Sequence, residues 1–429
     1  MNDIYMINDS TSSEDLLNFK RYLSPLMGIL TNPKTETPFT IGVFGPWGSG
    51  KSTLIDFIDT QLRESPEVEF FRIKFNPWLY RDEKNLIVPL LHTLQDTLDE
   101  SLDHRIVESA KKIGTVLTRI GAALFLKTVT ANQITLDDVE KQEKVYLDQY
   151  RRAQSEIRGL RTQLQKVVDE VTNKGRSTGD RVAGRMVFFI DDLDRCEPDQ
   201  IVALLESIKL FLDLKYCFFI LALDEEVIHR AIQIKYADFD FIDTRKSQIG
   251  QQYLEKMIQL PLYLYPLTER DLEDYLGGLE LPLQVKNQIK LFSEIMLPNP
   301  RKIKRIVNLF LLNYAVLQNN DVLSRQINNI AALARLIVLQ VQDYDLYKDI
   351  LANKEVPEYL SKVYRGEISI NDETAWAGLK ERREVVRNIC KEYNRPGTWI
   401  ERVFKPDNAF PKSNEIGQYF NMLGRGERG

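Results

Sequence analysis

The sequence predicts an α/β fold: a parallel sheet, a long helical arm inserted into the sheet domain, and a helical lid after it. Three segments support this prediction, namely FTIGVFGPWGSGKSTLIDFI (39–58), MVFFIDDLDR (186–195) and KYCFFILALD (215–224). In each, an apolar run typical of a strand buried on both faces leads into glycines or acidic residues. Ligands of open parallel sheets bind at the carboxyl ends of the strands, so we expect a functional site there.

The segment 39–58 contains a Walker A loop between a strand at 39–44 and an amphipathic helix. Its glycines let backbone N–H groups turn inward toward β- and γ-phosphates. Lys51 adds a full positive charge, and the Ser52 hydroxyl is placed to bind Mg²⁺. The predicted nucleotide-binding residues are Gly45, Pro46, Trp47, Gly48, Ser49, Gly50, Lys51, Ser52 and Thr53.

Paired acids follow the apolar run at 186–190. Asp191 is predicted to hold Mg²⁺ together with Ser52, and Asp192 is the candidate for polarising the attacking water. Two carboxylates beside a phosphate need a dication and a lysine such as Lys51 nearby. A helix cap or turn is the alternative for an Asp-Asp pair alone, but the Walker A loop favours a Walker B strand.

A third strand at 216–223 ends on Asp224. In P-loop proteins that insert a strand between the Walker A and Walker B strands, a polar residue here lies beside the γ-phosphate. Asp224 is therefore a candidate phosphate sensor. The alternative is an N-cap for the helix that begins at EEVIHRAI, because Asp caps helices well.

Four motifs in order resemble the KAP family of P-loop NTPases: FNPWLYRDEKNL (75–86), FFIDDLDRC (188–196), QQYLEKMIQLPLYLYPL (251–267) and NPRKIKRIVNLF (299–310). The resemblance runs from about residue 14 to about residue 360 and implies an AAA-like or STAND-like sheet with a small helical lid. It places Arg301 where a lid arginine senses the γ-phosphate. A basic helix start is the alternative, and Lys302, Lys304 and Arg305 compete for the role.

Two further points concern the FNPW motif and the residue after the Walker B Asp. Asn76 and Trp78 in FNPW are interpreted as packing that fixes the loop after the second strand. AAA-type enzymes usually place Glu after the Walker B Asp, whereas Asp192 is one methylene shorter. Asp194 therefore remains open as the base.

Many KAP proteins carry membrane-spanning helices between Walker A and Walker B, and this chain has an insertion at about 105–182. Its most apolar part, residues 113–130, is interrupted by Arg119 and Lys127, which leaves no run near the ~20 apolar residues that a spanning helix needs. We therefore expect no membrane span.

The rest of the insertion has a heptad-like period that predicts a long helix. Its seam positions are Leu136, Val139, Glu143, Tyr146, Tyr150, Ala153, Ile157, Leu160, Leu164, Val167 and Val171. An intramolecular hairpin with a helix at 107–129 is one interpretation, and self-association or docking of a partner protein is the other.

The predicted domains are a P-loop core at 1–104 and 183–265, the arm at 105–182, the lid at 266–360, and a C-terminal helical region with tail at 361–429. The first ten residues are polar and acidic, so we expect no signal peptide and a cytoplasmic protein. The three cysteines and three histidines have no metal-site or disulfide spacing.

The formal net charge of −5 argues against wholesale nucleic-acid binding. A local patch stays open, because KERREVVR (380–387) is basic and Trp376 and Trp399 read as exposed. A solvated helical face is the alternative.

Together these features predict a Mg²⁺-dependent ATPase of KAP type that acts as a nucleotide-driven switch. The resemblance implies a role in bacterial defence against phage or plasmids. The alternative is a nucleotide-gated scaffold that binds ATP with little turnover and assembles partners. A kinase is less favoured because no acceptor site is recognisable, and no motif distinguishes adenine from guanine.

Overall fold

The computed structural model describes residues 6–8, 15–66, 68–83, 86–100, 111, 159, 161–172, 184–211, 214–235, 243–265, 267–279, 281–327 and 329–423. The chain divides into two compact units. One comprises Asn18–Leu264, here called the sheet unit, and the other comprises Met1–Leu17 with Tyr265–Gly429, here called the helical unit. The predicted boundary at residue 360 lies inside a helix of the helical unit, Val356–Tyr364.

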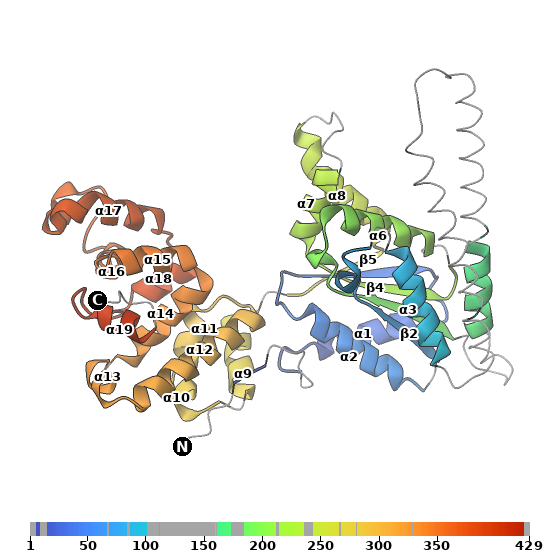
Figure 1. Cartoon of the computed structure of the whole chain (residues 1–429), viewed down its shortest axis with the longest axis horizontal. Coiled ribbons are helices and arrows are strands. Elements are labelled where there is room, and N and C mark those ends of the chain that lie inside the picture. The colour runs from blue at the N-terminus through green and yellow to red at the C-terminus, as the bar shows by residue number, and fades with distance from the viewer. Residues whose placement is uncertain are drawn as a thin grey trace. The chain divides into compact units, whose positions relative to one another are not determined.

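The sheet unit is built on a parallel sheet in the order β2-β3-β4-β1-β5 (Figure 1). Its strands are β1 (Phe39–Phe44), β2 (Phe70–Phe75), β3 (Arg185–Ile190), β4 (Cys217–Leu223) and β5 (Leu260–Tyr263). The predicted parallel sheet is confirmed, and β4 lies between β1 and β3. β5, in the motif at 251–267, was not predicted as a strand.

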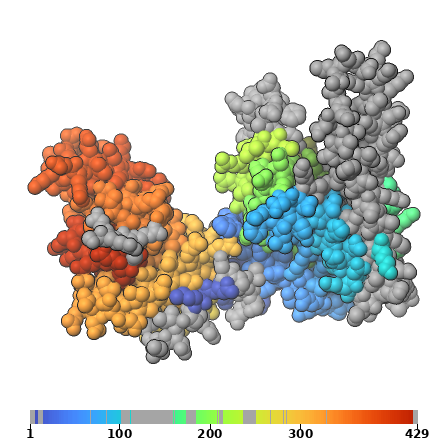
Figure 2. All heavy atoms as spheres, viewed as in Figure 1, coloured from blue at the N-terminus to red at the C-terminus, as the bar shows by residue number. Residues whose placement is uncertain are grey.

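Helices cover both faces of this sheet (Figure 1). They are α1 (Lys20–Thr31), α2 (Lys51–Arg63), α3 (Ile87–Asp99), α6 (Pro198–Phe211), α7 (Glu225–Lys235) and α8 (Asp243–Met257), with the 3-10 turns η1 (Pro77–Tyr80) and η3 (Leu193–Arg195). Neighbouring strand residues point to opposite faces. Phe188 and Phe219 therefore join the core under α3, α6, α7 and α8, while Phe189 and Ile220 are buried on the face of α1 and α2. The space-filling view shows the atoms of α2 and α3 on the outside of this unit (Figure 2).

The predicted arm lies mostly outside the described residues, but its last helical stretch, 161–172, is described. Leu164, Val167 and Val171 are at most 3% exposed and belong to the core that α3 and α6 share with the sheet. Thr172 O accepts a hydrogen bond from Gly184 N at 2.9 Å, just before β3. The arm was predicted as a domain of its own at 105–182, but the apolar seam of its last part packs on the core of the sheet unit.

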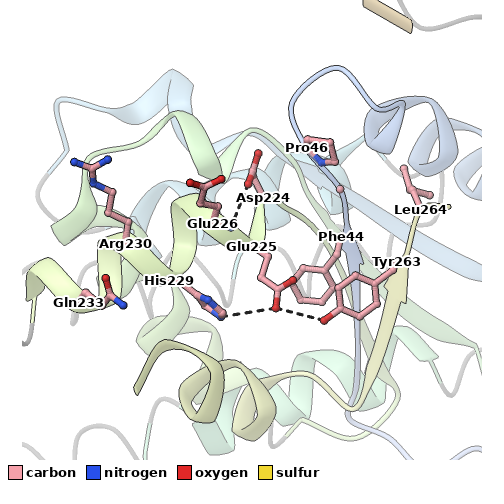
Figure 3. Close-up of a pocket in the computed structure, with 11 residues that line it drawn as sticks. Phe44, Pro46, Asp224, Glu225, Glu226, His229, Arg230, Gln233, Tyr263 and Leu264 are labelled. Atoms are coloured by element: carbon pink, nitrogen blue, oxygen red, sulfur yellow. Dashed lines mark hydrogen bonds and ion pairs between the residues drawn. The ribbon is translucent and has the colours of Figure 1, made fainter. Parts of the chain in front are cut away.

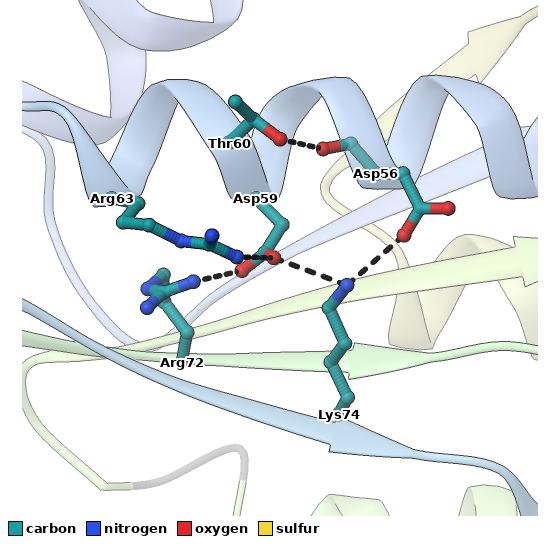
Figure 4. Close-up of polar contacts among 6 residues, drawn as sticks. All are labelled: Asp56, Asp59, Thr60, Arg63, Arg72 and Lys74. Atoms are coloured by element: carbon teal, nitrogen blue, oxygen red, sulfur yellow. Dashed lines mark hydrogen bonds and ion pairs between the residues drawn. The ribbon is translucent and has the colours of Figure 1, made fainter. Parts of the chain in front are cut away.

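A cluster of charges ties α2, the helix after the glycine-rich loop, to β2 (Figure 4). Asp59 is 3% exposed, and its oxygens lie 2.6 Å from Arg72 Nη1 and 3.0 Å from Lys74 Nζ. Lys74 also lies 3.0 Å from Asp56. Burial alone raises the pKa of the Asp59 carboxyl, but the hydrogen bonds and charges of Arg72 and Lys74 outweigh burial and lower it. The cluster fixes the position of β2 relative to the loop helix.

The helical unit has a hydrophobic core of its own. Its helices are α9 (Glu269–Gly278), α10 (Leu283–Lys286), α11 (Ile289–Ile295), α12 (Pro300–Gln318), α13 (Asp321–Gln326), α14 (Ile330–Gln342), α15 (Tyr344–Ala352), α16 (Val356–Tyr364), α17 (Arg383–Glu392), α18 (Trp399–Phe404) and α19 (Ile416–Met422), with the 3-10 segment η4 (Glu373–Arg382). They enclose one apolar core that continues through α16 into the C-terminal region.

Trp376 corrects the prediction of an exposed aromatic residue. It is fully buried, stacks on Tyr359 with ring centroids 5.3 Å apart, and donates from Nε1 to Ser369 O at 3.2 Å. Trp399 is partly buried against the same core. The two tryptophans predicted to lie on the surface of the basic patch therefore pack against the core of the helical unit.

Within the described ranges, no helix is both long and apolar enough to cross a bilayer. The apolar stretch at 113–130 lies outside those ranges. The three cysteines are buried free thiols.

Candidate active site

The glycine-rich loop runs from the end of β1 at Phe44 to the start of α2 at Lys51. Gly48 and Gly50 have φ of 83° and 99°, which side-chain-bearing residues rarely adopt. Gly50 is the N-cap of α2 and offers no capping side chain, so the first N–H groups of the helix stay available to an anion. Ser52 and Thr53 lie in this first turn. The loop thus has the backbone geometry that a phosphate requires.

The interior of this loop is polar and closely fitted. A Cβ added at Gly45 would lie 2.6 Å from Ser49 Oγ, so only glycine fits there without displacing the serine. Ser49 Oγ is itself buried and has no hydrogen-bond partner within the described part of the chain. A buried hydroxyl left without a partner costs free energy, and a phosphate oxygen in the loop would satisfy it. These observations fit the predicted phosphate site.

The Lys51 ammonium lies inside the loop. The residue is 7% exposed, and its Nζ donates to Gly45 O at 2.8 Å and to Pro46 O at 3.3 Å. Asp194 Oδ2 lies 3.7 Å from the same nitrogen, which brings the loop and the segment after β3 together. The buried cation therefore lies against both the loop carbonyls and Asp194, the alternative candidate for the base.

Asp191 and Asp192 follow β3. Asp191 N donates to Phe75 O of the neighbouring strand at 3.2 Å, and Asp191 Oδ1 accepts from Asp192 N at 2.8 Å. Asp192 has φ of 60°, a left-handed conformation that is unusual for a residue other than glycine. Its Oδ2 accepts from Asn76 Nδ2 at 2.9 Å, and its Oδ1 lies 2.7 Å from Arg195 Nε. Both carboxylate oxygens of Asp192 thus have a fixed partner.

The side chain of Asp194 is 9% exposed, against 20% for that of Asp192. Burial raises the pKa of the Asp194 carboxyl, and the nearby Lys51 opposes that rise. The negative charges of Asp224, Asp192 and Asp191 raise it further. The charges of three carboxylates therefore act on Asp194, which lies beside Lys51, and a dication would offset this concentration of negative charge.

Asp224 follows β4 and lines a pocket of about 670 Å³ next to the loop (Figure 3). The lining residues are Phe44, Gly45, Pro46, Asp224, Glu225, Glu226, His229, Arg230, Gln233, Tyr263 and Leu264. Asp224 Oδ1 also accepts from Glu226 N at 3.2 Å in the first turn of α7. The side chain thus makes the capping contact while its charge acts on Asp194, so both interpretations of this residue stay open.

Comparison with known proteins adds a family. The KAP family P-loop domain matches residues 19–317, more than half of the chain. The chain belongs to the KAP family of P-loop NTPases. Membership implies nucleotide binding, typically with Mg²⁺.

Within the described residues no group of three His, Cys, Asp or Glu side chains forms a metal site. Such a Mg²⁺ would be held by Ser52, Asp191, phosphate oxygens and water, as Mg²⁺ commonly is.

Two relatives are similar to this KAP chain. An uncharacterized protein of Methanocaldococcus jannaschii is 28% identical over 167 residues, which cover 34% of this chain and 86% of that protein. The phage T7 exclusion protein of Escherichia coli K12 is 24% identical over 251 residues, which cover 55% of this chain and 31% of that protein. This chain therefore matches less than a third of the exclusion protein's length.

Two solved structures show a weak likeness. Cdc6p from Pyrobaculum aerophilum has a TM-score of 0.41 at 14% identity and covers 97% of this chain and 89% of its own. The Orc1 protein of Aeropyrum pernix, solved in complex with DNA, has a TM-score of 0.35 at 10% identity. That match covers 97% of this chain and 85% of the Orc1 chain. These values are too low to transfer function.

The remaining predicted site residue of the KAP chain is Arg301. It lies in the first turn of α12 in the helical unit, where Asn299 caps the helix through Lys302 N at 3.1 Å. Lys304 and Arg305 lie further along the same helix. The sensor role of Arg301 stays a prediction.

Two functional candidates were missed from the sequence. Asn76 was interpreted as packing, and Arg195 was not considered, yet both contact Asp192. A signal existed for Asn76: Phe75 of β2 pairs with Ile190 of β3, so the residues that follow these strands emerge side by side. Arg195 could have been suspected because a residue three positions after an acid in a tight turn lies close to it.

Proposed function

We propose that this chain is a Mg²⁺-dependent ATPase that switches its helical unit between two conformations, which a partner protein reads. The observation that carries the proposal is the buried Lys51 ammonium, which lies inside the glycine-rich loop and 3.7 Å from Asp194. A buried lysine placed between loop carbonyls and Walker B acids suits a bound triphosphate. Self-association or partner binding through the arm belongs to the same proposal.

In this proposal, the loop N–H groups and Lys51 bind the β- and γ-phosphates, and Ser52 and Asp191 hold Mg²⁺. The bound metal supplies charge neutralisation on the phosphate oxygens. Asp192 orients a water molecule for in-line attack on the γ-phosphorus and accepts its proton, while the bond from that phosphorus to the β–γ bridging oxygen breaks and ADP leaves. Asp224 senses the γ-phosphate, and Arg301 stabilises the charge on the transferred group.

Phosphate release from ATP, GTP, CTP and UTP, measured with Mg²⁺ and with EDTA, tests the reaction and the choice of base. We expect metal-dependent turnover of ATP. Asp192→Asn should bind ATP normally and lose about 10²-fold in kcat. Asp194→Asn is the matched variant two residues away, and a larger loss there would move the base to Asp194. GTP turnover above ATP turnover would overturn the adenine assignment.

The second candidate is a nucleotide-gated scaffold with little turnover. One observation favours it: both oxygens of Asp192 are already engaged, by Asn76 and Arg195, so the carboxylate is restrained as a base. Turnover below one per hour, together with an ATP-dependent change in mass by light scattering, would favour the scaffold. Rapid turnover with constant mass would favour the switch enzyme.

We also propose phage exclusion as the biological setting, since one relative carries that name. The test is the efficiency of plating of phage T7 on bacteria expressing the chain or its Lys51→Ala variant. A loss of plaques that needs Lys51 supports the proposal. Equal plating on bacteria with and without the chain contradicts exclusion of T7.

A further inference from the structure

The guanidinium of Arg195 lies over two indole rings. Its Cζ is 5.9 Å from the ring centroid of Trp47 and 5.5 Å from that of Trp78. Trp47 belongs to the glycine-rich loop, Trp78 to η1 after β2, and Arg195 to η3 after β3. One side chain therefore connects the loop with the segments that follow two neighbouring strands.

The same guanidinium holds the candidate base. Arg195 Nε lies 2.7 Å from Asp192 Oδ1, a distance typical of a charge-assisted hydrogen bond. Asn76 Nδ2 fixes the other oxygen of Asp192 at 2.9 Å. With both oxygens held, the plane of the carboxylate is set, and its remaining lone pairs point in defined directions. The orientation of Asp192 thus depends on where Arg195 is held.

Burial does not explain why Trp47 stands beside Arg195. Its side chain is 61% exposed, so apolar burial contributes little to its position. The face of an indole attracts a guanidinium, and two faces on one guanidinium restrict it more than one does. The Cζ atom of Arg81 lies 5.7 Å from the ring centroid of Trp78, so the Trp78 ring has two guanidinium groups beside it, Arg81 and Arg195.

We propose that Arg195 is a positioning residue for Asp192, and that Trp47 transmits the state of the phosphate loop to it. The inference rests on the proposed function, in which Asp192 orients the attacking water. Phosphates in the loop fix the backbone at Trp47, its indole fixes Arg195, and Arg195 fixes the Asp192 carboxylate. We call this chain of contacts the Trp47–Arg195–Asp192 relay.

The experiment is a set of coupled substitutions, read as kcat and KM for ATP hydrolysis and as ATP affinity by calorimetry. Arg195→Ala removes the cation, and Arg195→Lys keeps the charge without the planar guanidinium. Trp47→Ala removes the ring, and Trp47→Phe keeps one. Arg81→Ala is the matched control, since it removes another guanidinium that lies over the same Trp78 ring. Each change is made in the wild-type chain and in Asp192→Asn, with melting curves to confirm folding.

We expect Arg195→Ala to lower kcat about tenfold with ATP affinity within about twofold. Trp47→Ala should lower kcat less, Trp47→Phe should restore most of it, and Arg81→Ala should leave it near wild type. In Asp192→Asn, measured by single turnover with excess protein, neither Arg195→Ala nor Trp47→Ala should slow hydrolysis further, because the relay acts through that carboxylate.

Equal losses from Arg195→Ala in the wild-type and Asp192→Asn backgrounds would overturn the relay, as would a change in ATP affinity alone. If Arg195→Ala does not fold, Arg195→Lys decides on the same criteria. If Asp192→Asn hydrolyses ATP as fast as the wild-type chain, Asp192 is not the base, and the relay is refuted with it. If Asp192→Asn loses most of its kcat while Arg195→Ala keeps the wild-type kcat, the relay is refuted and the proposed function stands.

Discussion

Asn76 Nδ2 donates a hydrogen bond to Asp192 Oδ2 at 2.9 Å and so joins two residues 116 positions apart in the sequence. The two strands before them, β2 and β3, are parallel and paired from Phe70 with Arg185 to Phe75 with Ile190. The sheet register, not local sequence, brings these side chains together. It places an amide donor on the carboxylate that we propose as the catalytic base.

The first prediction concerns that hydrogen bond. Asn76→Ala should lower kcat about tenfold and leave KM for ATP nearly unchanged, because the Asp192 carboxylate loses one of its two orienting partners. Initial rates of phosphate release over a range of ATP concentrations give both constants. The Asn76 side chain also caps η1 by accepting from Trp78 N, and the Asn320 side chain caps α13 in the helical unit, so Asn320→Ala is a matched control. A rise in kcat would show that Asn76 restrains Asp192 and would favour the scaffold.

The second prediction is a pH dependence of stability at Asp59. Its folded-state pKa is lowered from 3.8, so the charged carboxylate stabilises the fold above that value and loses this contribution as pH falls through the lowered pKa. Asp59→Asn should cost about 1–3 kcal/mol at pH 7, and the difference from wild type should shrink below pH 4. Urea unfolding at several pH values measures it.

The matched variant for Asp59 is Asp56→Asn. Asp56 shares Lys74 with Asp59, but its side chain is 43% exposed against 3% for Asp59. Its removal should cost less than about 1 kcal/mol at pH 7, as for exposed ion pairs. Equal losses from both variants, or a loss at Asp59 that does not change with pH, would contradict the buried charge cluster.

The third prediction separates the arm from the core. Replacing 107–158 with a short Gly/Ser linker should leave ATP affinity intact, because residues 161–172 stay in place to pack on the core. Extending the deletion through 172 removes Leu164, Val167 and Val171 from that core and should unfold the sheet unit. Circular dichroism melts and calorimetry with ATP compare the two deletions. Survival of the longer one would show that this packing is dispensable.

The fourth prediction follows from the burial of Trp376. Trp376→Ala should destabilise the helical unit by about 3–5 kcal/mol, since a fully buried indole and its hydrogen bond to Ser369 O are lost. Trp399→Ala is the comparison, because Trp399 lies at the edge of the same core, and it should cost less. Chemical unfolding of both variants gives the values. Equal small losses would contradict the buried position.

The strand, loop and helix at 39–58 were predictable because their pattern is local: apolar residues, then glycines, then Leu54, Ile58 and Leu62 on one helix face, all three now buried. Phe57 falls at the same helical spacing but is only partly buried, and its ring centroid lies 6.3 Å from that of Phe19. Local pattern places residues on a face but does not show how far a neighbouring element covers it.

Long-range contacts were harder to predict. Trp376 read as exposed because charged residues follow it, yet tertiary packing against Tyr359 buries it. Leu164 and Val167 fitted a heptad seam, and the same apolar period packs equally well on a sheet core. The contacts of Asn76 and Arg195 with Asp192 depend on strand register and turn geometry, which composition and spacing do not specify.

The most direct test of the central claim is the rate of phosphate release from Mg²⁺-ATP by the wild-type chain and by Lys51→Ala, with calorimetric ATP affinity measured on the same samples. Lys348→Ala is a control that also removes a lysine, there from an exposed pair with Asp345. The account predicts turnover and binding in wild type and in Lys348→Ala, with both lost in a folded Lys51→Ala. Near-normal ATP affinity or turnover in Lys51→Ala would contradict it.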